Sequence, residues 1–292
     1  MTASRVHPPV SLFICGLLVA GLALPRESRA ADPDYAIEYN RDFSTEGFDN
    51  RALAPFGAGA TSLLQQSEEG VEIAVPAGAE TKSVGLTPRF VVRGDFEITL
   101  WYEIKAWDEP QKGSGVGPTL YVTTSGDPSA AAEIGHLHRP EGERMHTTFA
   151  RAVVEGEQKK SARRFETETM QGQLRIRRTG SELDFEMRED WQDEPHRVLN
   201  SAEFSDGDIG LVRVGVKRSD TGARTEVRFK RLRIRADELP QLPSEERTSE
   251  PLYRPAYHPP PQTTNWTRLI LLGGGIVAVL AVSGTLFWRR TR

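Results

Sequence analysis

Apolar residues recur at every second position along most of this chain, and this period limits the fold more than any other feature of the sequence. Successive side chains point to opposite faces of a β-strand, so a period of two predicts strands with one apolar face. The clearest sets are Phe96, Ile98, Leu100, Tyr102 and Ile104, then Leu183, Phe185 and Met187, then Val212, Val214 and Val216.

Clusters of glycine, proline, aspartate and serine separate these runs, as expected for turns between short strands. Outside a C-terminal apolar segment, no stretch of convincing length shows a helical period. Many short strands divided by turns predict an all-β domain, a jelly-roll sandwich of two antiparallel sheets.

One predicted strand contains a break in its alternation. Val227 and Phe229 are in step with each other, whereas Leu232 and Ile234 are one position out of step. One extra residue around Lys230 returns both pairs to the core, so we predict a β-bulge there.

The start of the chain is typical of a secretory signal peptide. Residues 1–30 combine a basic residue, a short apolar run and small residues before a predicted cut after Ala30. The only cysteine, Cys15, lies inside that run. The mature chain is therefore expected to contain no disulfide and no thiolate chemistry.

The other end predicts a membrane anchor. The 20 residues from Leu269 to Trp288 carry no charge, and a helix of that length spans about 30 Å, the thickness of a hydrocarbon core. We predict a transmembrane helix over 267–288 and a basic cytoplasmic tail over 289–292. Seven prolines within 240–266 predict an extended stalk that carries the jelly-roll domain, 31–239. The alternative for the tail is removal after export.

The charge of the chain argues against nucleic acid as a partner. The formal net charge is −4, and the part between the two basic terminal segments is more acidic still. An acidic domain repels phosphate backbones. The predicted location is the cell membrane, with the domain outside the cytoplasm.

Several strand and turn patterns resemble a known family. They are Val92-Arg-Gly-Asp-Phe-Glu-Ile, Gly115-Val-Gly-Pro-Thr-Leu-Tyr-Val, His138-Arg-Pro-Glu-Gly, Arg178-Thr-Gly-Ser-Glu-Leu and Arg233-Ile-Arg-Ala-Asp-Glu-Leu-Pro. Over about residues 40–240 the chain resembles a secreted domain of unknown function abundant in planctomycete bacteria. That domain is similar in fold to the concanavalin A-like lectins and glucanases. The resemblance implies the fold and brings no agreed catalytic residues.

Glu182, Asp184 and Glu186 lie on one strand face in the pattern of a retaining glucanase. As an enzyme, the chain would use Glu182 as nucleophile, Glu186 as acid/base and Asp184 to orient them. The preceding strand offers another role for these acids. An even-numbered turn pairs Arg177 with Glu182 and Arg175 with Asp184, and arginines lower carboxyl pKa values. We therefore expect a salt-bridged face and no catalytic residues.

Three tryptophans are candidates for stacking on a sugar ring: Trp101 on a polar strand face, with Trp107 and Trp191 as extensions. His136 and His138 share one strand face and form an alternative metal site, but no third ligand is evident, so no metal or cofactor is expected. Arginines at 175, 177, 213, 228, 231, 233 and 235 suggest a basic strip, which neighbouring acids are expected to neutralise.

These observations favour a membrane-anchored, extracytoplasmic, lectin-like module that binds a glycan or a cell-envelope partner without catalysis. A retaining glycoside hydrolase using Glu182 and Glu186, and a purely structural envelope protein, are the alternatives.

Overall fold

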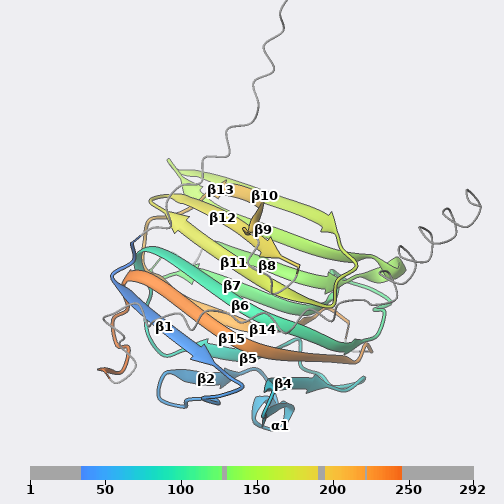
Figure 1. The fold of residues 1–292 in the computed structure, drawn as a ribbon. Coiled ribbons are helices and arrows are strands. Elements are labelled where there is room, and N and C mark those ends of the chain that lie inside the picture. Colours follow the sequence, from blue (N-terminus) through green and yellow to red (C-terminus); the bar gives the residue numbers. More distant parts are fainter. Residues whose placement is uncertain (1–33, 127–129, 190–194, 221, 245–292) are drawn as a thin grey trace, which may run out of the picture. The chain divides into compact units, whose positions relative to one another are not determined.

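In a computed structural model, residues 34–126, 130–189, 195–220 and 222–244 form two antiparallel sheets packed face to face (Figure 1). Sheet A has the order β13 (Arg197–Glu203), β12 (Glu182–Arg188), β11 (Gln171–Thr179), β6 (Arg93–Trp107), β15 (Thr225–Glu238), β4 (Gly70–Val75) and β3 (Leu64–Ser67), with β1 (Ile37–Asp42) also paired to β15. Sheet B has the order β10 (Glu157–Glu166), β9 (Arg144–Val154), β8 (Ala131–His138), β7 (Val116–Thr124), β14 (Ile209–Arg218), β5 (Ser83–Pro88) and β2 (Leu53–Phe56). One short helix, α1 (Ala60–Leu63), and one 3₁₀ turn, Pro140–Gly142, complete the described elements.

The apolar faces of the two sheets form one core between them. β7 of sheet B packs against β6, β11 and β15 of sheet A, and Figure 1 shows the two layers stacked. The alternating side chains of β6 that the sequence predicts as apolar are all buried, as are those of β12 and β14. The predicted all-β sandwich of two antiparallel sheets is therefore confirmed.

Two bulges set the side-chain directions in the central pair β6 and β15. The register shifts between Phe229 and Arg231, which confirms the predicted bulge and brings Leu232 and Ile234 into the core. A second shift leaves Lys105 of β6 as an extra residue, because Ile104 pairs with Val227 whereas the next pair along the strands is 106 with 226. A bulge turns the residues beyond it to the other face, so the end of β6 points inward.

The β11–β12 hairpin has a tighter turn than the predicted one. The predicted pairs of Arg177 with Glu182 and Arg175 with Asp184 are wrong by two residues, because Thr179 pairs with Glu182 across a two-residue turn. Gly180 has a φ of 57°, a conformation that glycine adopts without strain and that permits this turn. The prediction that the turn contains an even number of residues is correct, since Ile176 and Phe185 are paired and both buried.

The described part of the chain ends at residue 244, and the predicted signal peptide, transmembrane helix, tail and most of the stalk lie outside it. Within the described ranges no helix is long and apolar enough to cross a membrane. Pro240 accepts a backbone hydrogen bond from Val91, and Leu242 is buried in the core. Packing thus extends a few residues past the predicted domain boundary at 239.

A buried arginine ties the connection between the two sheets to the end of β14. Arg218 is 1% exposed, and its guanidinium donates to carbonyl oxygens of the segment between β4 and β5 and of the turn before β15. The acceptors are Pro76, Ala79, Thr81 and Ala223, at 2.7–3.3 Å. One side chain therefore satisfies several buried carbonyls at once.

Replacing Arg218 should destabilise the domain strongly. We expect Arg218→Met to lower the free energy of unfolding by about 3 kcal/mol or more, because buried carbonyls lose their donor. Arg224→Met is the control, since that side chain is 50% exposed and its loss should change stability by less than about 0.5 kcal/mol. Urea unfolding followed by tryptophan fluorescence measures both, and equal losses would contradict this role of Arg218.

Candidate functional site

The predicted carboxylates lie on the outer face of sheet A, which is organised around a buried acid. Glu97 of β6 is fully buried and ion-pairs with Arg175, Arg233 and Arg235 at 3.1, 2.9 and 2.8 Å. Burial raises the pKa of Glu97, but the charges of these arginines outweigh it and hold the pKa below its ordinary value. Glu97 is therefore a fixed charge that anchors the arginines.

The three acids of β12 differ in their surroundings. Glu182 is exposed beside the turn, Asp184 receives hydrogen bonds from Arg177 at 2.8 Å and Ser201 at 2.6 Å, and Glu186 is 3% exposed. Glu186 is held by Arg175 at 3.3 Å and Arg177 at 3.0 Å. An acid/base at this position is shielded from a polymeric substrate by its own ion pairs.

Glu186 lies outside the two predicted arginine–carboxylate pairs, and its pKa is raised rather than lowered. Burial raises its pKa, and the charges of Arg175 and Arg177 offset that effect only in part. The sequence pattern does not tell how much water the fold removes from a carboxylate.

Trp101 and Trp107 do not form one platform. Trp101 lies on the outer face of sheet A with Arg231 and Arg233 over its ring, at 5.4 and 5.5 Å from the ring centroid. Trp107 follows the bulge at Lys105, and its ring points into the core against His136 and His138. Trp191 lies outside the described residues.

The predicted basic strip is largely neutralised. Besides the arginines bound to Glu97, Arg228 pairs with Glu69, Glu72 and Glu103. Arg213 belongs to sheet B, where its guanidinium lies over the ring of Phe56, so its predicted place in the strip is wrong. This face of sheet A satisfies its own charges.

The two predicted metal ligands lie between the sheets together with a third histidine. His136 and His146 are cross-strand neighbours with ring centroids 4.6 Å apart, and His138 lies nearby under Trp107. Nδ1 of His136 is hydrogen-bonded to the hydroxyl of Tyr102 at 2.8 Å. Among the described residues, no group of three histidine, cysteine or acidic side chains is arranged to hold a metal ion.

Burial keeps these imidazoles neutral. It lowers the pKa of His136 well below its ordinary value, with His146 and Arg144 adding to the effect, and it also lowers the pKa of His138. The pKa of His146 is lowered to about 3 by burial and by Arg197. The three imidazoles therefore form a polar but uncharged part of the core.

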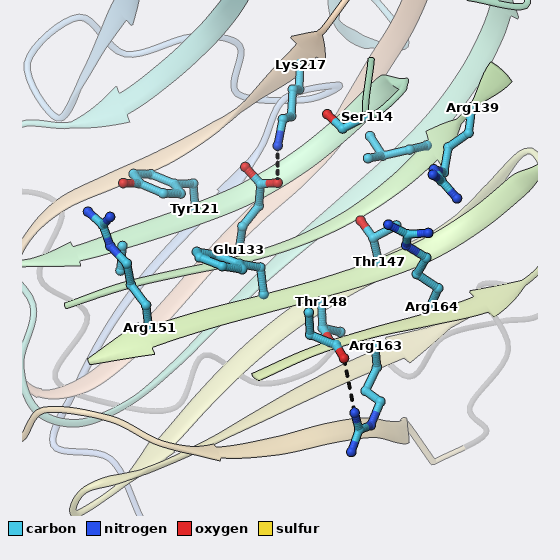
Figure 2. A pocket seen from close by; sticks show the side chains of 14 residues that line it. Ser114, Tyr121, Glu133, Arg139, Thr147, Thr148, Arg151, Arg163, Arg164 and Lys217 are labelled. Carbon is cyan, nitrogen blue, oxygen red and sulfur yellow. Dashed lines mark hydrogen bonds and ion pairs between the residues drawn. The ribbon is translucent and has the colours of Figure 1, made fainter. Parts of the chain in front are cut away.

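The outer face of sheet B carries a different kind of site, a groove of about 520 Å³ across five strands (Figure 2). A row of small residues crosses the face in register, since Gly215 pairs with Thr119, Thr119 with Gly135, and Gly135 with Thr147. Side chains in the neighbouring rows are longer and stand higher than this row on the outer surface of sheet B.

Two aromatic rings and a carboxylate stand in the next row. Tyr121 of β7 pairs with Glu133 of β8, which pairs with Phe149 of β9. The two aromatic residues are therefore two strand spacings apart, about 10 Å. Phe149 is 37% exposed, one of few large apolar side chains so exposed in the described part of the chain. Glu133 binds Lys217 of β14 at 2.6 Å, as Figure 2 shows.

No pattern in the sequence predicts this groove. The stretch Thr147-Thr-Phe-Ala-Arg151 alternates, but it is Thr148 and Ala150 that face the core and Phe149 that faces outward. A rule that places the larger apolar residue inside selects the wrong face here. The available signal was the series of small inward residues on β8 and β9, since on β9 their alternation gives Phe149 the opposite, outward parity.

Two packed antiparallel sheets with an open groove on one outer face define an all-β sandwich. The chain belongs to the family described as "Protein of unknown function (DUF1583) C domain", which matches residues 22–254. No curated protein matches the chain.

Solved structures with similar folds include a prokaryotic β-1,3-1,4-glucanase (lichenase) from a mouse hindgut metagenome, with 7% identity, a TM-score of 0.48, and coverage of 68% of this chain and 98% of that one. A legume lectin-like domain from Entamoeba histolytica has 15% identity, a TM-score of 0.43, and coverage of 64% and 90%. The β-glucanase of Bacillus licheniformis has 8% identity, a TM-score of 0.42, and coverage of 68% and 97%. Likenesses at this level imply nothing about activity.

The buried histidines should make the domain sensitive to acid. Their folded-state pKa values lie below the unfolded value of about 6.5, so their stabilising effect is complete above that pH and is lost as the pH falls. His196, with a pKa of about 2, acts in the same direction, and Glu186, with its raised pKa, acts in the opposite one.

Replacing one histidine of the cluster should flatten this dependence. Between pH 7.5 and 5, we expect His146→Leu to lose less unfolding free energy than the parent, by up to about 2 kcal/mol. Urea unfolding at both pH values measures this change in unfolding free energy, and the packing effect of leucine cancels because it is the same at both. The exposed Val198→Ala control should keep the parent's dependence on pH. An unchanged slope in His146→Leu would show that this imidazole is not protonated on unfolding.

Proposed function

We propose that this protein is a non-catalytic carbohydrate-binding module, held at the outer side of a cell membrane, and that the groove of sheet B is its binding site. The observation that carries the proposal is the pair of aromatic residues on either side of Glu133, the half-buried Tyr121 and the exposed Phe149. Aromatic rings offer an apolar face to the C–H side of a sugar, and the carboxylate accepts hydrogen bonds from hydroxyl groups.

The groove suits an extended ligand. It crosses β14, β7, β8, β9 and β10, which is four strand spacings or about 19 Å. Sugar hydroxyls would find further polar groups at Thr147 and Ser114. A long and shallow site of this kind fits a segment of polysaccharide better than a small compact metabolite.

The acids present support binding rather than hydrolysis. Glycoside hydrolysis needs two carboxyl groups at the scissile bond. The residues lining the groove include one carboxylate, Glu133, which is ion-paired to Lys217. Glu182 and Glu186 belong to β12 on the outer face of the other sheet. The raised pKa of Glu186 is the one feature in favour of the hydrolase alternative, and its burial opposes it.

The predicted signal peptide and C-terminal apolar segment support the membrane location. A charge-free stretch of spanning length after a proline-rich segment would present the sandwich to the space outside the cytoplasm. Such a tethered module would bind a polysaccharide of the cell envelope or its surroundings.

Removing the two aromatic rings should abolish most glycan binding. On an array of neutral and acidic polysaccharides, we expect Tyr121→Ala/Phe149→Ala to weaken the binding of the full-length chain roughly tenfold or more, since each stacked ring contributes about 0.5–1.5 kcal/mol. Trp101→Ala, on the outer face of sheet A, is the matched control and should bind like the parent.

Loss of glycan binding in Trp101→Ala alone would instead place the binding site on sheet A. Release of reducing sugar that disappears in Glu182→Gln/Glu186→Gln would replace the binding proposal with the hydrolase alternative. Near-ultraviolet circular dichroism of each variant confirms that it is folded.

The tether predicts detergent-dependent behaviour. The full-length chain should fractionate with membranes and need detergent to be extracted, whereas a chain ending at residue 266 should be released without it. Protease added outside intact cells should remove the domain of the full-length protein. Recovery of the full-length chain in the soluble fraction, or its protection from protease, would contradict the proposed location.

A further inference from the structure

The groove of sheet B is strongly basic although the chain as a whole is acidic. Five basic side chains and one acidic side chain line it, against a formal net charge of −4 for the protein. The basic residues are Arg139, Arg151, Arg163, Arg164 and Lys217. A hollow lined by one sign of charge concentrates the opposite charge there.

The charges in the groove are not balanced as those of sheet A are. Arg139 pairs with Glu143 at 2.6 Å and Lys217 with Glu133 at 2.6 Å. Within the described part of the chain, Arg164 of β10 is exposed to solvent and has no carboxylate at ion-pairing distance. On sheet A, by contrast, the central arginines are all bound to Glu97, Asp184 or Glu186.

The cations are distributed along the groove rather than gathered at one point. Arg164 of β10 pairs with Thr147, so it stands at the end of the row of small residues, and Lys217 of β14 lies toward the other end. Arg151 lies in the row beyond Phe149. In Figure 2, Arg139 and Arg164 lie on the opposite side from Tyr121 and Arg151. This spacing fits a polymer with repeated charges better than a single small anion.

We propose that the ligand is an acidic polysaccharide whose carboxylate or sulfate groups contact Arg151, Arg164 and Lys217 while its rings pack over Tyr121 and Phe149. This inference rests on the proposed carbohydrate-binding function and names its ligand class. Guanidinium groups bind carboxylate and sulfate oxygens through paired N–H donors, and these charge-assisted hydrogen bonds are about twice as strong as neutral ones.

A polysaccharide suits the groove better than a nucleic acid does. Glu133 stands between the two aromatic rings, where it would repel a phosphate backbone stacked along them but would accept hydrogen bonds from sugar hydroxyls. The acidic remainder of the chain also repels a long, densely charged strand. Acidic groups carried once per sugar or less often can meet the separate cations of the groove.

The test compares one polymer with and without its charges. Binding of the full-length chain in detergent to polygalacturonate, to its methyl-esterified form and to chondroitin sulfate is measured by biolayer interferometry at low and high salt. We expect at least one acidic polymer to bind roughly tenfold tighter than the methyl ester at low salt, with the preference shrinking at high salt. Polygalacturonate carries carboxylates alone and chondroitin sulfate carries both groups, so tighter binding of chondroitin sulfate would show that sulfate adds to the recognition.

Charge-neutralising variants locate the effect. Arg151→Gln/Arg164→Gln should lose the preference for the acidic polymer and keep the residual binding of the methyl ester. Arg224→Gln, which replaces an exposed arginine that does not line the groove, should retain the preference. Tyr121→Ala/Phe149→Ala should weaken both forms.

Failure of this inference and failure of the proposed function give different results. Equal binding of the acid and the methyl ester, dependent on Tyr121 and Phe149, would overturn the acidic ligand and leave carbohydrate binding intact. No binding of any polysaccharide by the parent chain would overturn both. Tighter binding of a single-stranded oligonucleotide than of either acidic polymer, lost in Arg151→Gln/Arg164→Gln, would replace the polysaccharide with a nucleic acid.

Discussion

The two sheets share one apolar layer, and this arrangement governs where every other side chain can lie. Every strand of the sandwich has an inner side that must be apolar or fully satisfied, and an outer side that meets solvent. Chemistry with external ligands is therefore confined to the two outer faces and the loops. The faces have opposite electrostatic character: sheet A neutralises its arginines internally, whereas sheet B presents an open basic groove.

Several of the buried polar groups are held by specific partners. Arg218 binds backbone carbonyls, His136 binds the hydroxyl of Tyr102, and Glu97 is covered on the outer face of sheet A by three arginines. Each such group costs desolvation, which ion pairs and hydrogen bonds offset only while the surrounding packing is intact. The buried charges and imidazoles thus make the sandwich dependent on a single arrangement of its strands and on a neutral or basic pH.

The three acids of β12 show why a motif alone is a weak guide to catalysis. Spacing placed Glu182, Asp184 and Glu186 on one face, as in an enzyme, and the fold kept them there. The spacing did not indicate how deeply each acid is buried. Glu182 is exposed, Asp184 is hydrogen-bonded to an arginine and a serine, and Glu186 is buried. Depth depends on neighbouring strands, which here bring Arg175 and Arg177 over Glu186.

The sequence by itself determined the all-β class, the inward faces of β6, β12 and β14, and the bulge near Lys230, because alternation is a local property of the chain. The register of β11 with β12 needed the conformation of Gly180, and the inward turn of Trp107 needed the bulge at Lys105. The groove needed more, since Tyr121, Phe149 and Arg164 come from three strands. Only the order of strands in sheet B, set by long-range pairing and packing, brings them together.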